Sequence, residues 1–203
     1  GEAHCATPDG GGKSESNAMS LQLITPPAAE PLTLAEAKAH LKVDTTDDDA
    51  LITSLITAAR TRAEWLTHRA LITQSWIFWR DGWPADGFEL PLPPLQSLAS
   101  ITAYDLNDAA TVLDASSYRL DAAGVPARIG WRPAVVPPPS LRAFNTLAVA
   151  FTAGYGNAGS DVPEPIRRAL LAIVADLYTH RGDEAPTPAA ALALLEPYRV
   201  MQL

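Results

Sequence analysis

The sequence has 203 residues, a formal net charge of −8 and a single cysteine, Cys5. The acidic balance and the lack of a lysine or arginine run disfavour a protein that grips DNA phosphates. No apolar stretch approaches the length of about 20 residues that a membrane helix needs, so we expect a soluble protein made in the cytoplasm.

Residues 1–18 end in Ser-Asn-Ala directly before Met19, which is typical of an expression tag and linker. We therefore expect residues 19–203 to form one domain. Because the only cysteine falls in the tag, this domain is expected to have no disulfide and no thiolate chemistry.

The first predicted elements are two helices within residues 33–69. Thr33 followed by Glu36 is the pattern of a capping box, which predicts a short helix from Leu34 to about Lys42. A longer helix follows, because apolar residues recur at helical spacing: Leu51, Ile52, Leu55, Ile56, Ala59, Ala63 and Leu66. The aspartates before it lack the spacing and the turn glycine of a calcium loop, so they suit a helix N-terminus better than a metal: Asp44, Asp47, Asp48 and Asp49.

Residues 70–153 predict a sheet. Ile72, Trp76 and Phe78 recur with an even spacing, which is the period of a strand. Further short strands are predicted in LASITAYD, YRLD, ARIGW and TLAVAFTA, with proline-rich segments between several of them. Short strands separated by proline-rich segments favour a small, mostly antiparallel sheet.

Helical spacing returns in residues 163–196, and residues 197–203 form a tail after Pro197. The order predicts an α+β fold, a bundle of about four helices with an inserted, mostly antiparallel sheet. The apolar spacing predicts one helical core made by these residues: Ile52, Leu55, Ile56, Leu170, Ile173 and Leu177.

Residues 154–159 spell G-x-G-x-x-G, so a nucleotide-binding enzyme is an alternative function. In such a site the helix begins inside the motif and a second strand follows that helix. Here Pro163 and Pro165 delay the helix, and no strand is predicted after it. We therefore interpret Gly154, Gly156 and Pro163 as a structural hinge between sheet and helix.

No other pattern predicts a catalytic, cofactor or metal residue. His40, His68 and His180 each fall near the end of a predicted helix, where an imidazole suits the helix dipole, and no short ligand spacing links them. No nucleophile motif is present. The tryptophans could stack a ligand, but such residues are more often core or interface residues: Trp65, Trp76, Trp79, Trp83 and Trp131. The sequence thus favours a protein that is not an enzyme.

Several segments taken in order closely resemble the phage and prophage head–tail connector (adaptor) proteins, which join the portal to the tail machinery. These segments are LTLAEAKAHLKVD, DDDALITSLITAARTRAEWLTHRALITQSW, LPLPPLQSLASITAYD, YRLD, VAFTAGYG, VPEPIRRALLAIVADLYTHRG and LLEPYRV. The resemblance runs from about Thr25 to Val200, and WRPAVVPPPSLRAFN is a variable loop region.

This resemblance implies a structural virion protein with packed helices and a β insertion, assembled in a ring of about twelve copies. Its implied partners are further copies of itself, the portal, and a tail or head-completion protein. It implies that double-stranded DNA passes through the lumen without specific binding, which the acidic balance suits. The implied location is the virion neck, after assembly in the host cytoplasm. A free-standing DNA-binding protein is a further alternative.

The family supplies no interface residues by motif, so we predict them from chemistry. The candidates are two tryptophans of the sheet and the apolar tail: Trp76, Trp79, Tyr198, Arg199, Val200, Met201 and Leu203. The tail either docks on a neighbouring copy or the portal, or folds back on its own helices.

Overall fold

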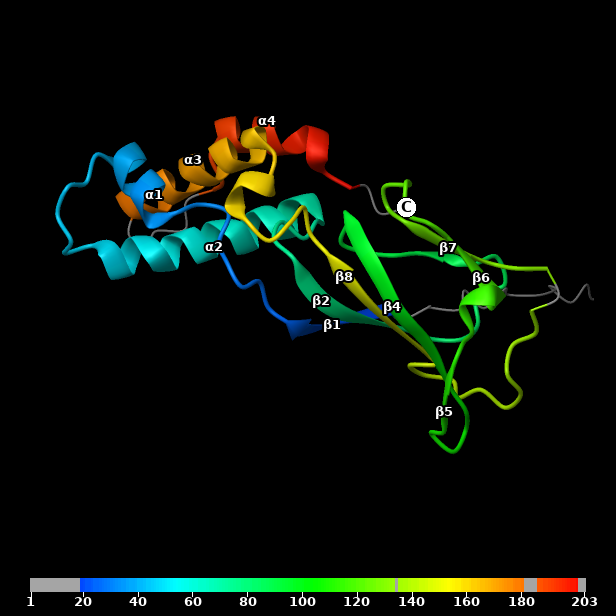
Figure 1. Cartoon of the computed structure of the whole chain (residues 1–203). Helices are drawn as coiled ribbons and strands as arrows, with labels where there is room; N and C mark the ends of the chain where they lie inside the picture. The colour runs from blue at the N-terminus through cyan, green and yellow to red at the C-terminus, as the bar shows by residue number, and fades with distance from the viewer. Residues whose placement is uncertain (1–18, 134, 181–185, 201–203) are drawn as a thin grey trace, which may run out of the picture.

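The computed structural model describes residues 19–133, 135–180 and 186–200. The molecule is elongated, with the helices at one end and twisted sheets at the other (Figure 1). The described α-helices are α1 (Leu34–Leu41), α2 (Asp49–Thr67), α3 (Glu164–His180) and α4 (Ala189–Leu195). The predicted α+β class is therefore confirmed.

The helical end begins with the predicted capping box. The Thr33 side chain accepts a hydrogen bond from the Glu36 backbone N–H, and the Glu36 carboxylate accepts one from the Thr33 backbone N–H. Lys42 caps the C-terminal end of α1 and His68 caps that of α2, and both residues adopt the left-handed conformation. Glu36 also pairs with Arg167 of α3, which ties α1 to the last half of the chain.

The helical core forms where α1, α2, α3 and α4 meet. Four of the six predicted core residues are fully buried there: Ile52, Ile56, Leu170 and Ile173. Leu55 and Leu177 pack against the same cluster while staying partly exposed. The helical periodicity therefore identifies the buried face, with these two residues at its margin.

A five-stranded sheet has the order β1-β2-β8-β4-β5, and a three-stranded sheet has the order β3-β7-β6, with every strand pair antiparallel. The strands are β1 (Met19–Thr25), β2 (Gln74–Arg80), β3 (Phe88–Glu89), β4 (Leu95–Tyr104), β5 (Ala110–Val112), β6 (Tyr118–Asp121), β7 (Arg128–Trp131) and β8 (Leu147–Ala153). The sheet segment predicted at 70–153 thus gains one strand, β1, that precedes the helices.

A second core lies between the two sheets. Phe78, Ile101 and Val149 of the large sheet and Phe88 and Ile129 of the small sheet are buried in it. At its margin, the rings of Trp83 and Trp131 stack with centroids 4.3 Å apart. The small sheet covers one face of the large sheet, so the fold has two cores, one helical and one between sheets.

The described helices include none with the length and apolar character needed to cross a membrane.

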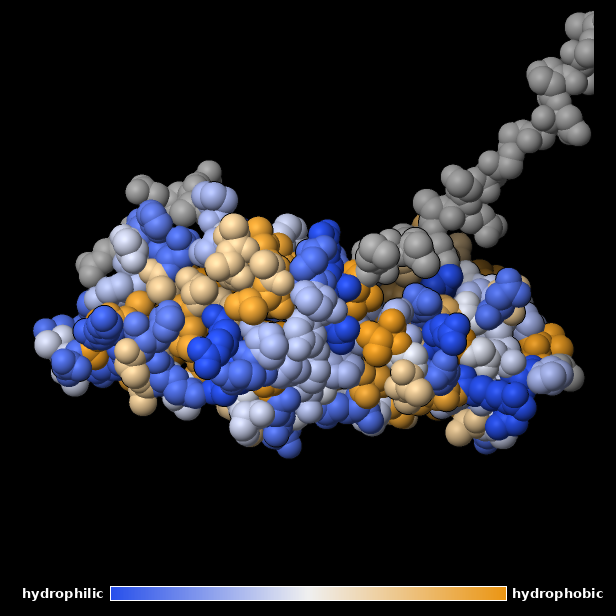
Figure 2. Space-filling model, turned by 90° about the horizontal axis from the view of Figure 1, so that it is seen from above, coloured by the Kyte–Doolittle hydropathy of each residue, from blue (hydrophilic) through white to orange (hydrophobic). Residues whose placement is uncertain are grey.

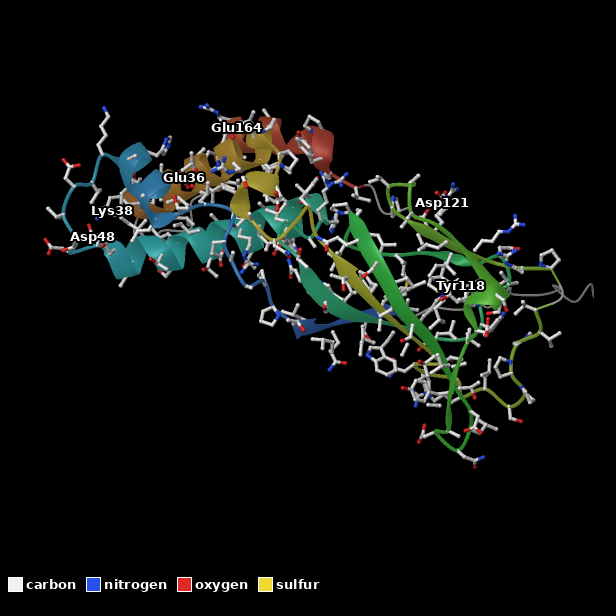
Figure 3. All side chains as sticks on the ribbon, viewed as in Figure 1. Glu36, Lys38, Asp48, Tyr118, Asp121 and Glu164 are labelled. Carbon is white, nitrogen blue, oxygen red and sulfur yellow. The ribbon has the colours of Figure 1, made fainter. Side chains whose placement is uncertain are left out.

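Figure 3 shows that polar side chains lie at both ends of the molecule, with Glu36 and Glu164 among the helices and Tyr118 and Asp121 at the sheet end.

Candidate assembly surfaces

The glycine loop lies at the joint between the helices and the sheets. Three backbone hydrogen bonds join it to two other segments. Gly154 N–H donates to the Pro94 carbonyl at 2.9 Å, Tyr155 N–H donates to the Leu71 carbonyl at 3.1 Å, and Thr73 N–H donates to the Gly156 carbonyl at 2.9 Å. These bonds join the end of β8 to the segments that lead into β2 and β4. The loop therefore holds the sheet to the chain that leaves α2.

The three glycines bring the loop into close contact with its own chain. Gly154 has φ +132°, and a Cβ there would lie 2.5 Å from the Ile72 carbonyl. A Cβ on Gly156 would lie 2.1 Å from the Asp161 carboxylate, and one on Gly159 would lie 2.5 Å from the Pro31 carbonyl. Each glycine is thus needed for packing against the protein itself.

A carboxylate of the chain itself accepts the hydrogen bond of a backbone N–H in this loop. Asp161 accepts a hydrogen bond from the Ala158 backbone N–H at 2.9 Å. In a nucleotide site such loop N–H groups face the pyrophosphate. The negative charge of Asp161 opposes an anion here, and the geometry supports the structural interpretation of Gly154 and Gly156.

Close to the loop, a charged cluster on α2 ties the helices to the sheet. Glu64 accepts hydrogen bonds from Arg60 at 2.8 Å, from the Leu71 backbone N–H at 2.9 Å and from the Gln74 amide at 2.5 Å. Arg60 also binds Glu30 at 2.8 Å. The cluster therefore links the segment before α1, the helix α2 and the first residue of β2.

The electrostatics of this cluster follow from its burial. Burial raises the pKa of Glu64, although its hydrogen bonds and Arg60 act in the opposite direction. Burial alone lowers the pKa of Arg60, but Glu30 and Glu64 together raise it. The two shifts are consistent because Arg60 divides its charge between two carboxylates and compensates Glu64 only in part.

The predicted tail follows its own helices as far as the structure describes it. Tyr198 packs against the helical core, and its carbonyl accepts a hydrogen bond from Arg69 at 2.5 Å. The Val200 N–H donates to the Thr67 carbonyl at 3.0 Å, while Arg199 is exposed. Met201 and Leu203 lie outside the described residues. This is the fold-back alternative that the sequence left open, and docking of the tail stays a prediction.

The two predicted interface tryptophans lie on opposite faces of β2, and both are half-buried. Trp79 packs against Tyr104 with centroids 5.9 Å apart and donates from its ring N–H to Gln22 at 3.2 Å. Trp76 borders the core between the sheets, and its buried ring N–H has no hydrogen-bond partner among the described residues. Their interface role therefore stays a prediction.

The remaining candidates are accounted for by local structure. His40 lies in the last turn of α1, His68 caps α2 and His180 ends α3, as predicted. Asp49 pairs with Lys38 at 2.5 Å and Asp48 accepts a hydrogen bond from Tyr178. Within the part of the chain that the structure describes, no group of three histidine, cysteine or acidic residues could hold a metal.

Residues 31–121 match the family model of the phage gp6-like head-tail connector protein. Among solved structures, the neck of an empty gene transfer agent (GTA) particle, computed with C6 symmetry, is 27% identical with a TM-score of 0.77 over 91% of this chain and 97% of that chain.

The resemblance to head–tail connector proteins is confirmed. Two further structures similar to this chain are the native GTA virion and the native GTA neck, the latter computed with C12 symmetry. The virion match has 26% identity and a TM-score of 0.74 over 90% of this chain and 96% of that chain. The neck match has 26% identity and a TM-score of 0.72 over 90% of this chain and 97% of that chain. Comparison with curated proteins gives no match.

These findings support a structural neck protein of a phage-like particle. The connector family and the neck structures are structural proteins, which agrees with the absence of a catalytic motif in the sequence. The neck structures also support an oligomeric ring within a particle.

Proposed function

We propose that the chain forms a ring of about twelve copies that joins the portal to the tail and lets double-stranded DNA pass through its lumen. The observation that carries this proposal is the likeness to neck proteins across the fold. It covers 91% of this chain and 97% of the similar chain. The similar necks were computed with C6 and C12 symmetry, which suits a ring of twelve.

The charges suit a lumen that does not hold DNA. The net charge is −8, and several arginines are already paired with carboxylates: Arg60, Arg128, Arg142, Arg167 and Arg168. An arginine that is already paired with a carboxylate is less available to bind a DNA phosphate and displace its counterions. On the face seen in Figure 2, hydrophilic and hydrophobic residues are interspersed. Passage of DNA therefore meets little specific attraction.

The proposal includes the partners and the place of assembly. The ring meets the portal on one side and a tail or head-completion protein on the other, after assembly in the host cytoplasm. Trp76, Trp79 and the tail are proposed contacts in this assembly.

Electron microscopy of the purified chain, alone and mixed with its portal, tests the proposal. We expect closed rings of cyclic symmetry with a central hole wide enough for a DNA duplex. A chain that stays monomeric in both samples contradicts the proposal. A salt-dependent DNA shift by the monomer would favour a free-standing DNA-binding protein instead.

A further inference from the structure

Strand β1 forms an edge of the large sheet and is exposed throughout. It pairs with β2 alone, so its other edge has no strand beside it among the described residues. Met19, Leu21, Leu23 and Ile24 are 61%, 41%, 43% and 50% exposed. The strand MSLQLIT contains no charged residue and no proline. Natural proteins protect such edges with charges, proline or a covering segment, so an uncovered β1 is expected to attract another strand.

The side chains of β1 extend the face that is buried elsewhere in the sheet. Leu21 is paired with Phe78 and Leu23 with Trp76, and both partners belong to the core between the sheets or its margin. Side chains on paired residues lie on the same face of a sheet. The apolar face therefore continues onto β1, whose outer edge has no paired strand among the described residues.

The other side of the same sheet offers a second free edge. Within the described ranges, β5 pairs only with residues 102–104 of β4, so residues 95–100 of β4 pair there with β8 alone. Within this segment Gln96, Ser97 and Ala99 are exposed, and none of its residues is charged. Figure 1 shows the strands in the order β1, β2, β8 and β4 across the sheet.

Strand direction makes the two edges compatible. The pairs β1–β2, β2–β8 and β8–β4 are all antiparallel, so β1 and β4 run in opposite directions. If the next copy continues the sheet, its β4 lies antiparallel to β1. Two antiparallel strands from different copies can therefore pair their backbone N–H and C=O groups in a regular ladder.

We propose that β1 of each copy pairs with residues 95–100 of β4 in the next copy, which joins neighbouring sheets around the ring. The inference rests on the proposed ring. A ring needs two different surfaces that meet head to tail, and the two edges of one sheet provide them. Copies that each carry a net charge of −8 repel one another, so uncharged strands are suitable places for close contact.

Disulfide cross-linking between introduced cysteines tests this contact. In a Cys5→Ser background, Gln22→Cys is combined in turn with Gln96→Cys, Ser97→Cys and Ala99→Cys. Within one copy, β2 and β8 separate the two strands, which places their Cα atoms about 14 Å apart. A disulfide needs Cα atoms within about 7 Å, so a bond can form only between copies.

We expect at least one of these pairs to give, on mild oxidation, a series of covalent multimers up to the size of the ring. Gln22→Cys alone should give no more than the background of dimers. The matched control combines Ser97→Cys with Val125→Cys, an exposed residue in the small-sheet region, and should give no series. Amide hydrogen exchange should also be faster in β1 of the monomer than in β1 of the ring.

Rings that form without any cross-linked series overturn the inference while leaving the proposed function intact. Efficient dimers from Gln22→Cys alone also overturn it, because they show β1 paired with β1 of another copy. If micrographs show no ring with or without the portal, the proposed function fails and this contact fails with it.

Discussion

Replacing Glu64 by alanine should strongly destabilise the joint between helices and sheet. Its carboxylate accepts hydrogen bonds from Arg60, from the Leu71 backbone N–H and from the Gln74 side chain. In Glu64→Ala, Arg60 keeps Glu30, but the other two donors lose the partner that the structure shows for them. Both belong to buried residues, so water cannot readily replace the carboxylate.

The magnitude follows from these two donors. Leaving a buried donor unsatisfied costs about 1–3 kcal/mol, so the two together predict a loss of about 2–6 kcal/mol in the free energy of unfolding. Glu64→Gln keeps an acceptor oxygen, so its free energy of unfolding should fall less than that of Glu64→Ala. The matched control is Glu164→Ala, whose ion pairs with Arg167 and Arg168 are exposed and should contribute no more than about 1 kcal/mol.

Urea unfolding followed by circular dichroism measures these differences, with the ring kept dissociated by low protein concentration. A loss below about 1 kcal/mol for Glu64→Ala, or a loss equal to that of Glu164→Ala, would refute the role given to the cluster. Such a result would mean that water satisfies the donors of Leu71 and Gln74.

The same residue predicts a pH dependence. Burial raises the pKa of Glu64 in the folded state above its ordinary value of 4.5, so the folded chain holds this proton more tightly than the unfolded chain. The contribution of Glu64 to stability is therefore largest below pH 4.5 and falls as the pH rises through the raised pKa. Glu64→Gln should remove this fall, which a comparison of unfolding midpoints across that range would detect.

Further predictions concern the core, the glycine loop and the tail. Leu170→Ala should cost about 2–5 kcal/mol and Leu55→Ala less, since Leu55 is only partly buried; equal urea midpoints for both would contradict the core assignment. Gly156→Ala should lower the melting temperature, because its Cβ would meet a carboxylate of the same loop, and an unchanged value would show that the loop can adjust. Millimolar NAD or ATP should leave the melting temperature unchanged, whereas a clear rise would restore the nucleotide-binding alternative. A chain stopped after Glu196 should lose about 2–4 kcal/mol through lost packing and hydrogen bonds of Tyr198 and the residues after it. Near-normal stability with lost ring formation would instead establish the docking role of the tail.

The helices could be predicted because their sequence signals are local. Thr33 and Glu36 form a complete capping box within four residues, and the apolar spacing in α2 and α3 identifies the buried face. Burial at the margin of that face depends on tertiary contacts, which explains why Leu55 and Leu177 are less buried than their spacing predicts.

Strand β1 was not predicted, although a signal for it was present. Met19, Leu21 and Leu23 alternate with Ser20 and Gln22 at the period of a strand. The segment is short and precedes the helices, whereas all other strands lie between the two helical regions. Its place beside β2 depends on a pairing across fifty or more residues, which local patterns do not specify.

Amino-acid composition does not predict which surface the tail contacts, nor the contacts of the Glu64 cluster between helices and sheet. An apolar tail is equally suited to its own helices and to a partner, and only the contacts of Tyr198 and Val200 distinguish these cases for the described residues. The Glu64 cluster was missed for a related reason. Arg60 and Glu64 have the i,i+4 spacing of a helical ion pair, but Glu30 lies before the first predicted helix and Gln74 lies in the predicted sheet, and no spacing links these two to the pair.

The glycine loop shows how one chemical property can serve two structural purposes. Lack of a Cβ lets a backbone approach a pyrophosphate, and it equally lets Gly154 approach Ile72 and Gly159 approach Pro31. The difference lies in what the loop N–H groups face. Here Asp161 supplies the negative charge that a phosphate would supply in a nucleotide site, and its carboxylate lies against Gly156. An acidic side chain two residues after the last glycine is therefore the local signal that favours a self-contained turn, because it would repel the phosphate that the glycines would otherwise admit.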